Sequence, residues 1–188
     1  MDYFFQGFSS FYEVLWVFLI YAFFGWCSEV AYAALNTGKF VNRGFLNGPF
    51  CPLYGSSSVI IITLLNPFKN NFILLFIMST ILTSAIEYVT GFLLEKVFNQ
   101  KWWDYTEDPF NLHGRICLLF SLMWGAACVL IIKIVQPIFA ALLSFISYKM
   151  MIYVCIGFAV YFAVDGAATL LKLANIDISS KFNLNKFA

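Results

Sequence analysis

Three acidic residues stand inside long apolar stretches of the sequence, namely Glu29, Glu87 and Asp165. A charged side chain within hydrocarbon costs at least a few kcal/mol unless it is paired or hydrated, so such residues usually face the interior of a helix bundle. Each lies about 15–18 residues after the start of its stretch, roughly 22–27 Å at the helical rise per residue. If the three stretches cross a membrane in the same direction, their carboxylates meet at one depth. The spacing therefore predicts a buried acidic site.

Basic partners for these acids stand nearby in the sequence. Arg43 and Arg115 each lie in a polar loop shortly before an apolar stretch begins again. An arginine can bind a carboxylate through two parallel hydrogen bonds, which offsets part of the cost of removing both charges from water. The same two loops contribute the remaining candidate substrate- or ion-binding residues, which are Asn42, Asn47, Asn111, His113, Trp103, Asp104 and Tyr105. The alternative interpretation is that this polar cluster only holds helices together.

The aromatic run Trp102–Tyr105 allows two interpretations as well. Tryptophan and tyrosine prefer the headgroup zone of a bilayer, so a plain aromatic belt is the simpler one. Asp104 is unexpected within such a belt, and we expect it to hold an arginine or the ammonium group of a substrate.

The residue pattern gives little support to a nucleophilic active site, a metal site or an ATPase site. Cys51 or Cys117 beside His113 would be a nucleophile pair, but no third residue is evident that would orient the histidine. A metal site built from His113, Cys117 and the acids lacks any diagnostic ligand spacing. The sequence also contains no phosphate-binding loop of an ATPase. We therefore expect no catalytic residue, no metal and no cofactor, and the pattern leans against an enzyme.

Composition decides the class of protein. The chain has 188 residues, of which 62% are hydrophobic and 11% are charged, whereas soluble domains carry roughly 25% charged residues. Such a chain cannot cover its apolar surface with a polar coat. The net charge of +1 argues against binding to nucleic acid, which needs a basic surface. No Lys or Arg precedes Lys39, so we expect no cleaved signal peptide.

The fold class expected is an all-α membrane protein, a polytopic bundle of about five transmembrane helices within one domain over residues 1–188. The predicted spans are Phe11–Leu35, Phe50–Leu65, Asn71–Phe98, Ile116–Val135 and Met150–Leu173. Pro137–Ile146 is apolar but too short to span, so we expect an interfacial or half-inserted helix there. A six-crossing arrangement that counts this segment is the alternative. The Gly- and Pro-rich run Gly48–Pro52 is a candidate re-entrant turn.

Basic residues in the loops predict the orientation of the bundle. With the N-terminus outside and the C-terminus inside, eight basic residues fall on the cytoplasmic side and three fall outside. The eight are Lys39, Arg43, Lys96, Lys101, Arg115, Lys172, Lys181 and Lys186, and the three are Lys69, Lys133 and Lys149. The acidic and arginine cluster then lies near the cytoplasmic face.

A weak internal repeat relates residues 11–66 to residues 71–135, and residues 136–188 follow it. Each unit has a glutamate late in an apolar stretch, then a polar loop, then an aromatic residue followed by glycine. The pairs are Glu29 with Tyr54-Gly55 and Glu87 with Trp124-Gly125. Transporter folds often arise from such duplications, although so few matching positions could also coincide by chance.

Several motifs carry a resemblance to a known family. They are Phe24-Gly25-Trp26 with Glu29, the run Gly38–Pro49, Cys51-Pro52 with Tyr54-Gly55, Glu87-Tyr88, Leu94-Glu95-Lys96, Trp102–Tyr105, and Phe110-Asn111-Leu112 with Gly114–Cys117. Over about Phe23–Pro137 the chain resembles the CmpB-like family, which is labelled an ABC-transporter permease of type IV. The resemblance implies a multi-pass protein of the cell membrane, of the kind found in the inner membrane of bacteria. It brings no established catalytic residues.

These observations favour a small transport component, surrounded by membrane lipids and working with a separate ATPase subunit or as a homo-oligomer. The first alternative is an intramembrane enzyme that acts on a lipid or isoprenoid headgroup, with the carboxylates as acid and base. The second is a non-catalytic membrane partner or regulatory subunit. No nucleic acid is expected among its partners.

Overall fold

The computed structural model describes residue 8 and residues 10–184, with side chains through residue 173. Two long helices, α1 (Phe11–Thr37) and α3 (Phe72–Phe98), each begin at a side-chain cap. The Ser10 hydroxyl accepts from the Glu13 amide at 3.2 Å, and the Asn71 side chain accepts from the Leu74 amide at 3.0 Å. Both helices end in a left-handed residue, Gly38 or Asn99, which is the usual way to terminate a helix.

The remaining helices are α2 (Pro52–Leu65), the short 3₁₀ helix η1 (Asn66–Phe68), α4 (Leu118–Leu130), the π-helical turn η2 (Ile131–Val135), α5 (Gln136–Leu143) and α6 (Tyr148–Leu184). Among the described residues, four apolar helical segments are long enough to cross a membrane, namely α1, α3, the continuous run from α4 to α5, and the first part of α6. The multi-pass helical membrane fold is therefore confirmed.

The fifth expected span is shorter than a full crossing. The helical run Pro52–Phe68 falls below the length of the other four, and at the helical rise α2 alone covers only ~21 Å. Proline explains both ends, because Pro52 starts α2 and Pro67 lies in the 3₁₀ turn that follows it. Phe50 and Cys51, expected within this span, belong to the preceding loop and are buried there.

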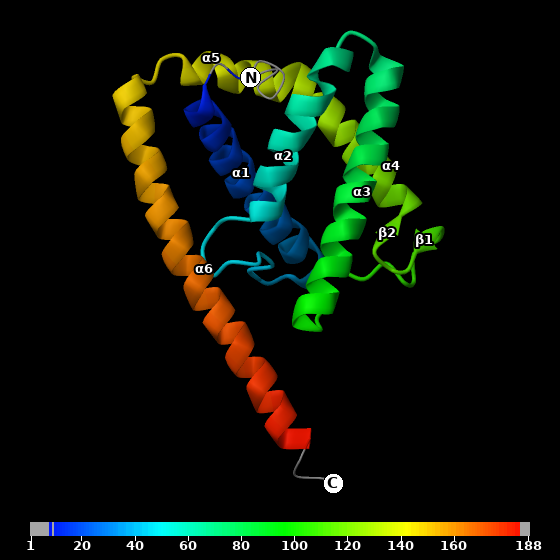
Figure 1. Ribbon diagram of the computed structural model, residues 1–188. Helices are drawn as coiled ribbons and strands as arrows, with labels where there is room; N and C mark the ends of the chain where they lie inside the picture. The colour runs from blue at the N-terminus through cyan, green and yellow to red at the C-terminus, as the bar shows by residue number, and fades with distance from the viewer. Residues whose placement is uncertain (1–7, 9, 185–188) are drawn as a thin grey trace.

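The short helix expected at Pro137–Ile146 is present as α5 (Gln136–Leu143). Instead of standing alone, α5 continues α4 through the π-helical turn η2. A π turn inserts an extra residue and bends a helix, and Figure 1 shows α5 lying across one end of the bundle after this bend. At eight residues α5 covers only ~12 Å, too little for the sixth crossing of the alternative arrangement.

The fold is not purely helical, because the predicted fourth span begins with a small hairpin. Strands β1 (Asn111–Leu112) and β2 (Ile116–Cys117) pair antiparallel. Between them His113 and Gly114 both have positive φ, and the Arg115 amide donates to the Leu112 carbonyl at 3.1 Å. Two positive φ angles in a tight turn favour a β-hairpin over a helix start, which delays α4 to Leu118.

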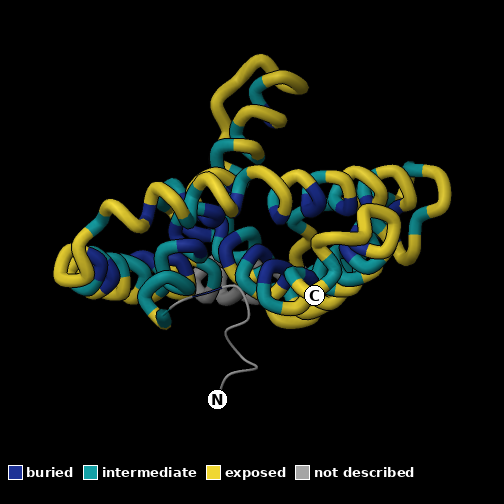
Figure 2. Tube along the Cα trace, turned by 90° about the horizontal axis from the view of Figure 1, so that it is seen from above, coloured by how far each residue is buried: buried dark blue, intermediate teal, exposed yellow. Residues whose placement is uncertain are grey.

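Two connecting loops lie at the same end of the bundle. Residues 38–51 join α1 to α2 and residues 99–117 join α3 to α4, opposite the end crossed by α5 (Figure 1). Buried positions gather between the helices, while outward faces are largely exposed (Figure 2). Many exposed side chains are large and apolar, including Ile73, Ile81 and Val164. Such an apolar exterior suits a lipid environment.

Candidate functional site

The first helical hairpin, α1 with α2, holds Glu29 against a tyrosine. The Tyr54 hydroxyl of α2 donates to the Glu29 carboxylate of α1 at 2.5 Å. Arg43 from the following loop reaches the second oxygen of Glu29 at 3.6 Å and lies over the Tyr32 ring. The predicted Glu29–Arg43 pair therefore forms, and Tyr54 joins it.

Glycine makes this contact geometrically feasible. A Cβ atom at Gly25 would collide with the Tyr54 side chain, and one at Gly55 would stand 2.6 Å from the Phe18 carbonyl oxygen. Small residues let membrane helices approach closely. The absence of side chains at Gly25 and Gly55 therefore sets the distance at which Tyr54 meets Glu29.

The second hairpin, α3 with α4, also holds its glutamate, Glu87, against a tyrosine. The Tyr105 hydroxyl, from the loop between the two helices, donates to the Glu87 carboxylate at 2.9 Å. The Trp124 side chain of α4 is the other polar neighbour of this carboxylate. The second oxygen of Glu87 is buried and has no hydrogen-bond partner among the described residues. Glu87 therefore keeps an acceptor free in the interior.

The two hairpins meet through an aromatic pair that lies beside their glutamates. Tyr54 and Trp124 pack edge to face with their ring centroids 5.6 Å apart, and Glu29 is a charged neighbour of both Glu87 and Tyr105. We call Glu29, Tyr54, Glu87, Tyr105 and Trp124 the carboxylate cluster. Arg43 is the cation found at its edge among the described residues, so the cluster holds more acidic than basic groups.

Asp165, expected to share this site, has a different set of partners. It accepts from the Asn47 amide at 3.2 Å, the Asn47 side chain at 3.0 Å, the Gly48 amide at 2.9 Å and the Tyr161 hydroxyl at 3.2 Å. Asn47 also donates to Thr169 at 2.8 Å. Asp165 therefore fastens α6 to the loop between α1 and α2, and we call this contact the α6 latch.

Asn42 organises the same loop from within. Its side-chain oxygen accepts from the Trp26 indole at 2.9 Å and from the Gly44 amide at 3.0 Å. Its side-chain nitrogen donates to the carbonyls of Leu46 and Asn47. All four contacts are structural, so Asn42 shapes the loop that carries Arg43 and Asn47.

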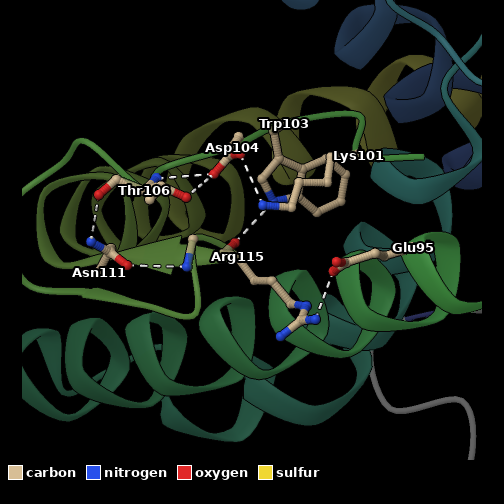
Figure 3. A network of polar contacts seen from close by, with 8 residues as sticks. Glu95, Lys101, Trp103, Asp104, Thr106, Asn111 and Arg115 are labelled. Carbon is tan, nitrogen blue, oxygen red and sulfur yellow. Dashed lines mark hydrogen bonds and ion pairs between the residues drawn. The ribbon is translucent and has the colours of Figure 1, made fainter. Parts of the chain in front are cut away.

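The loop between α3 and α4 carries a second polar network (Figure 3). Arg115 donates to Glu95 of α3 at 2.6 Å, and its guanidinium lies over the rings of Tyr88 and Phe92. Glu95, and not one of the three predicted acids, is therefore the ion-pair partner of Arg115. The Trp103 indole donates to the Arg115 carbonyl at 2.9 Å, which ties the β-hairpin to the loop segment that follows α3.

The other residues predicted in this loop hold its shape. Asp104 accepts from Lys101 at 2.9 Å and from the amide and hydroxyl of Thr106 (Figure 3). Asn111 donates to the carbonyls of Thr106 and Asp108, and it accepts from the Gly114 amide. His113 is exposed, and its Nδ1 meets the Tyr88 hydroxyl at 2.9 Å.

Two groups of this loop have shifted pKa values. Hydrogen bonds from the Thr106 side chain, Lys101 and the Thr106 amide lower the pKa of the exposed Asp104 carboxyl to about 2. Burial, followed by the neighbouring Glu87 charge, raises the pKa of Tyr105 above its ordinary value. Tyr105 therefore remains a hydrogen-bond donor to Glu87 across the physiological pH range.

A cavity of about 290 Å³ opens beside the carboxylate cluster, between α1, α2 and the run from α4 to α5. Tyr54 and Trp124 form one part of its wall, and Ile131 and Val135 of the π-helical turn form another. Each of the first two residues also touches a glutamate of the cluster. The cavity therefore ends against the aromatic side of the cluster.

Several of the residues that build these contacts lie outside the predicted set. Tyr54 and Trp124 stand in the repeated aromatic-glycine motif, which marks them without revealing that they reach the acids. Tyr161 and Thr169 lie on the same face of α6 as Asp165, four residues before and after it. Glu95 belongs to the motif Leu94-Glu95-Lys96 near the end of a span, and that motif does not reveal its partner.

One of the comparisons with known proteins identifies a family. A sequence model of the family described as "Putative ABC-transporter type IV" matches residues 16–170 of the chain. No significant match was found among curated proteins or among solved structures. The match includes both helical hairpins, the carboxylate cluster and the α6 latch. The chain is therefore a member of this ABC-transporter-type family of membrane proteins.

Proposed function

We propose that this chain is the membrane-spanning component of a transporter, and that its carboxylate cluster receives the substrate. The observation that carries the proposal is that Glu29 and Glu87, on separate helices, are each held by a tyrosine hydroxyl. Buried acids within membrane helices commonly mark a substrate or ion pathway. The free acceptor on Glu87 and the adjoining cavity leave room for a ligand.

The family membership supports a partnership with a separate ATPase subunit. The sequence itself contains no phosphate-binding loop, so energy from ATP would have to come from another chain. A homo-oligomer is part of the same proposal, because one copy supplies few spans for a complete transport pathway. The exposed apolar faces of α3 and α6 offer surfaces for such contacts as well as for lipid.

The proposed orientation places the N-terminus outside and the cluster near the cytoplasmic face of the cell membrane. Basic residues support it, since Arg43, Lys101 and Arg115 all lie in the two loops at one end of the bundle. The re-entrant turn belongs to the same proposal. The Cys51 backbone amide donates to the Ala22 carbonyl at 2.9 Å, and Ala22 precedes the end of α1 at Thr37 by ~22 Å of helix.

The test replaces Glu87 by glutamine in cells that contain the full chain and its partner subunits. Untargeted mass spectrometry of cells and medium should find a solute whose distribution depends on the wild-type chain. Glu87→Gln should reduce that transport at least about tenfold, the effect of losing one charge-assisted contact of ~1.4 kcal/mol. Glu107→Gln, at an exposed loop position, is the matched control and should transport normally.

Two outcomes would contradict the proposal. If Glu87→Gln chiefly lowers the amount of folded chain in the membrane, the cluster is a packing element. If no solute depends on the wild-type chain, the chain is not a transport component and the role of a non-catalytic partner or regulatory subunit gains support.

The cavity favours one second candidate, an intramembrane enzyme that acts on a lipid or isoprenoid headgroup. Its aromatic wall ends at Tyr54 and Trp124, which both touch carboxylates that could act as acid and base. The same mass spectrometry separates the two candidates. An enzyme changes the chemical identity of a lipid, whereas a transporter changes only the side of the membrane on which a solute accumulates.

A further inference from the structure

The cavity beside the carboxylate cluster has an aromatic lining. Five rings contribute to its wall, those of Tyr21, Phe24, Tyr54, Trp124 and Phe139. Tyr21 and Phe139 pack edge to face at 5.9 Å, and Tyr54 and Trp124 do so at 5.6 Å. Aromatic rings attract a cation through the negative charge on their faces, and cages of such rings recognise quaternary ammonium groups.

Of the four hydroxyl groups in the cavity lining, those of Tyr21, Ser28, Tyr54 and Ser58, the first three donate to other acceptors. Tyr54 donates to Glu29, Tyr21 donates to Gln136 at 3.2 Å, and Ser28 donates to the Gly25 carbonyl at 2.8 Å. An anion would need free donors at this wall, and these three hydroxyls supply none. A ligand whose surface carries no hydrogen-bond acceptor fits the wall better.

The charge behind the wall has the opposite sign to that of an ammonium group. The Tyr54 hydroxyl contacts Glu29, which is also paired with Arg43. Trp124 is a neighbour of Glu87. One oxygen of Glu87 is buried and without a partner among the described residues. A cation seated on the rings would be attracted by this carboxylate across Trp124, in surroundings where water screens charges only weakly.

The other side of the cavity is aliphatic and adjoins the outside of the bundle. Ile131 and Val135 belong to the π-helical turn, a feature often found at functional sites. Phe24 lines the cavity and is 53% exposed, on a chain whose outer faces suit lipid. An alkyl tail can therefore extend from the cavity past Phe24 into the hydrocarbon.

We propose that the cavity binds the quaternary ammonium head of a cationic amphiphile, whose alkyl tail remains in the bilayer. The aromatic rings hold the head, and the Glu87 carboxylate behind them neutralises its charge. As a statement about the substrate class, this inference rests on the proposed transport function. As a statement about binding, it can be tested without transport.

The test measures binding of radiolabelled dodecyltrimethylammonium to the full chain, purified in uncharged maltoside micelles. Micelles without protein correct for partition into detergent. The matched ligand is the neutral isostere in which carbon replaces the quaternary nitrogen. We expect saturable binding of the cation and at least about tenfold weaker binding of the isostere, because only the charge is lost.

Variants locate the site. Trp124→Leu should weaken binding of the cation roughly tenfold, and Trp124→Phe, which retains a ring and the packing, should weaken it less. Glu87→Gln should also weaken it, while binding of the neutral isostere stays unchanged. Trp102→Leu is the control, because Trp102 packs on Phe45 and Phe98, outside the cavity lining.

Several outcomes would overturn the inference. Equal affinity for the cation and its isostere would mean that the cavity takes up any alkyl chain. Equal losses in Trp124→Leu and Trp102→Leu, or full affinity in folded Trp124→Phe and Glu87→Gln together, would place binding elsewhere. If Glu87→Gln reduces solute transport as expected but the wild-type chain does not bind the cation, only this inference is wrong. If the chain binds the cation but transports no solute, only the proposed function is wrong.

Discussion

The two helical hairpins, α1 with α2 and α3 with α4, hold their glutamates with similar residues but stabilise their connecting loops differently. Each carries a half-buried glutamate, an aromatic residue that meets it from another segment, and a loop organised by amide or carboxyl side chains. The first loop is stapled by Asn42 and fastened to α6, whereas the second is stapled by Asp104 and closed by a β-hairpin. We propose that the hairpins descend from a duplication and that their loops then diverged.

The difference teaches where each arginine can act. In the first hairpin Arg43 reaches the glutamate of the cluster, while in the second Arg115 is taken by Glu95. Glu87 thus lacks the cation that Glu29 has. The asymmetry leaves one carboxylate of the pair neutralised within the chain and the other available to a ligand.

The largest effect expected concerns the α6 latch, which only the first hairpin has. Asp165→Ala removes the acceptor for the Asn47 and Gly48 amides and the Tyr161 hydroxyl. Hydrogen bonds to a charged group contribute ~1.5–3 kcal/mol each and are not additive, so we expect a loss of about 3 kcal/mol. Reversible unfolding in mixed micelles of maltoside and sodium dodecyl sulfate measures it.

Asp165→Asn, which keeps an acceptor oxygen, should lose less than Asp165→Ala. Gly166→Ala is the control on the same helix, because a Cβ there meets no other atom within 4 Å. A loss in Asp165→Ala no greater than in the control would remove the distinction between the two loops.

A smaller effect concerns the contact between the helices of each hairpin. Gly55→Ala places a Cβ 2.6 Å from the backbone oxygen of Phe18, which cannot rotate away. Overpacking of this kind costs ~1–3 kcal/mol. At Gly125 the added atom meets the Thr80 hydroxyl, a side-chain group that can change rotamer.

Gly125→Ala should therefore cost clearly less than Gly55→Ala, measured by the same unfolding experiment. Alanine also gains up to ~1 kcal/mol of helix propensity over glycine at both sites, so the difference between the variants reports the packing. Equal costs would show that the two helix contacts are equally tight.

The smallest effect expected is a selective response to acid. Asp104 has a pKa of about 2, below the value of about 3.9 for a free aspartate. Its ionised form therefore contributes stability that is complete above pH ~4 and is lost as the pH falls toward 2. Asn42, the corresponding residue of the first loop, does not titrate.

Amide hydrogen exchange measured by NMR compares the two loops directly. The Thr106 amide donates to Asp104 and the Gly44 amide donates to Asn42, both at 3.0 Å. After correction for intrinsic exchange rates, protection at Thr106 should fall between pH 4 and pH 2 while protection at Gly44 remains. A parallel fall at both amides would indicate general unfolding.

Much of this architecture follows from the sequence, because the bilayer imposes simple rules on length and polarity. Apolar runs of sufficient length located the four long helices, and loop residues such as Asn42 and Asn111 were recognisable as a polar group. Depth arithmetic also singled out three acids. It gives position along the membrane normal but not around it, which is why Asp165 was expected beside Glu29 and yet binds Asn47 and Gly48.

The remaining features depend on contacts between segments far apart in the sequence. Tyrosine and tryptophan suit both an interfacial belt and a buried hydrogen bond, so nothing at Tyr54 or Trp124 alone reveals its partner. The sequence offers several acids as partners for Arg115. It pairs with Glu95 because the β-hairpin turns the arginine toward the end of α3. The π-helical turn has no recognisable sequence pattern within an apolar run.

The α6 latch has a consequence for how the chain could be assembled. In lipid, helix association brings little hydrophobic stabilisation. Ring packing and the α6 latch at Asp165 therefore hold α6 in place. A polypeptide ending at Ile146 and a second one starting at Ser147 would each carry half of that latch. Made as separate pieces in one bilayer, the two fragments hold what they need to recognise each other and rebuild the whole protein.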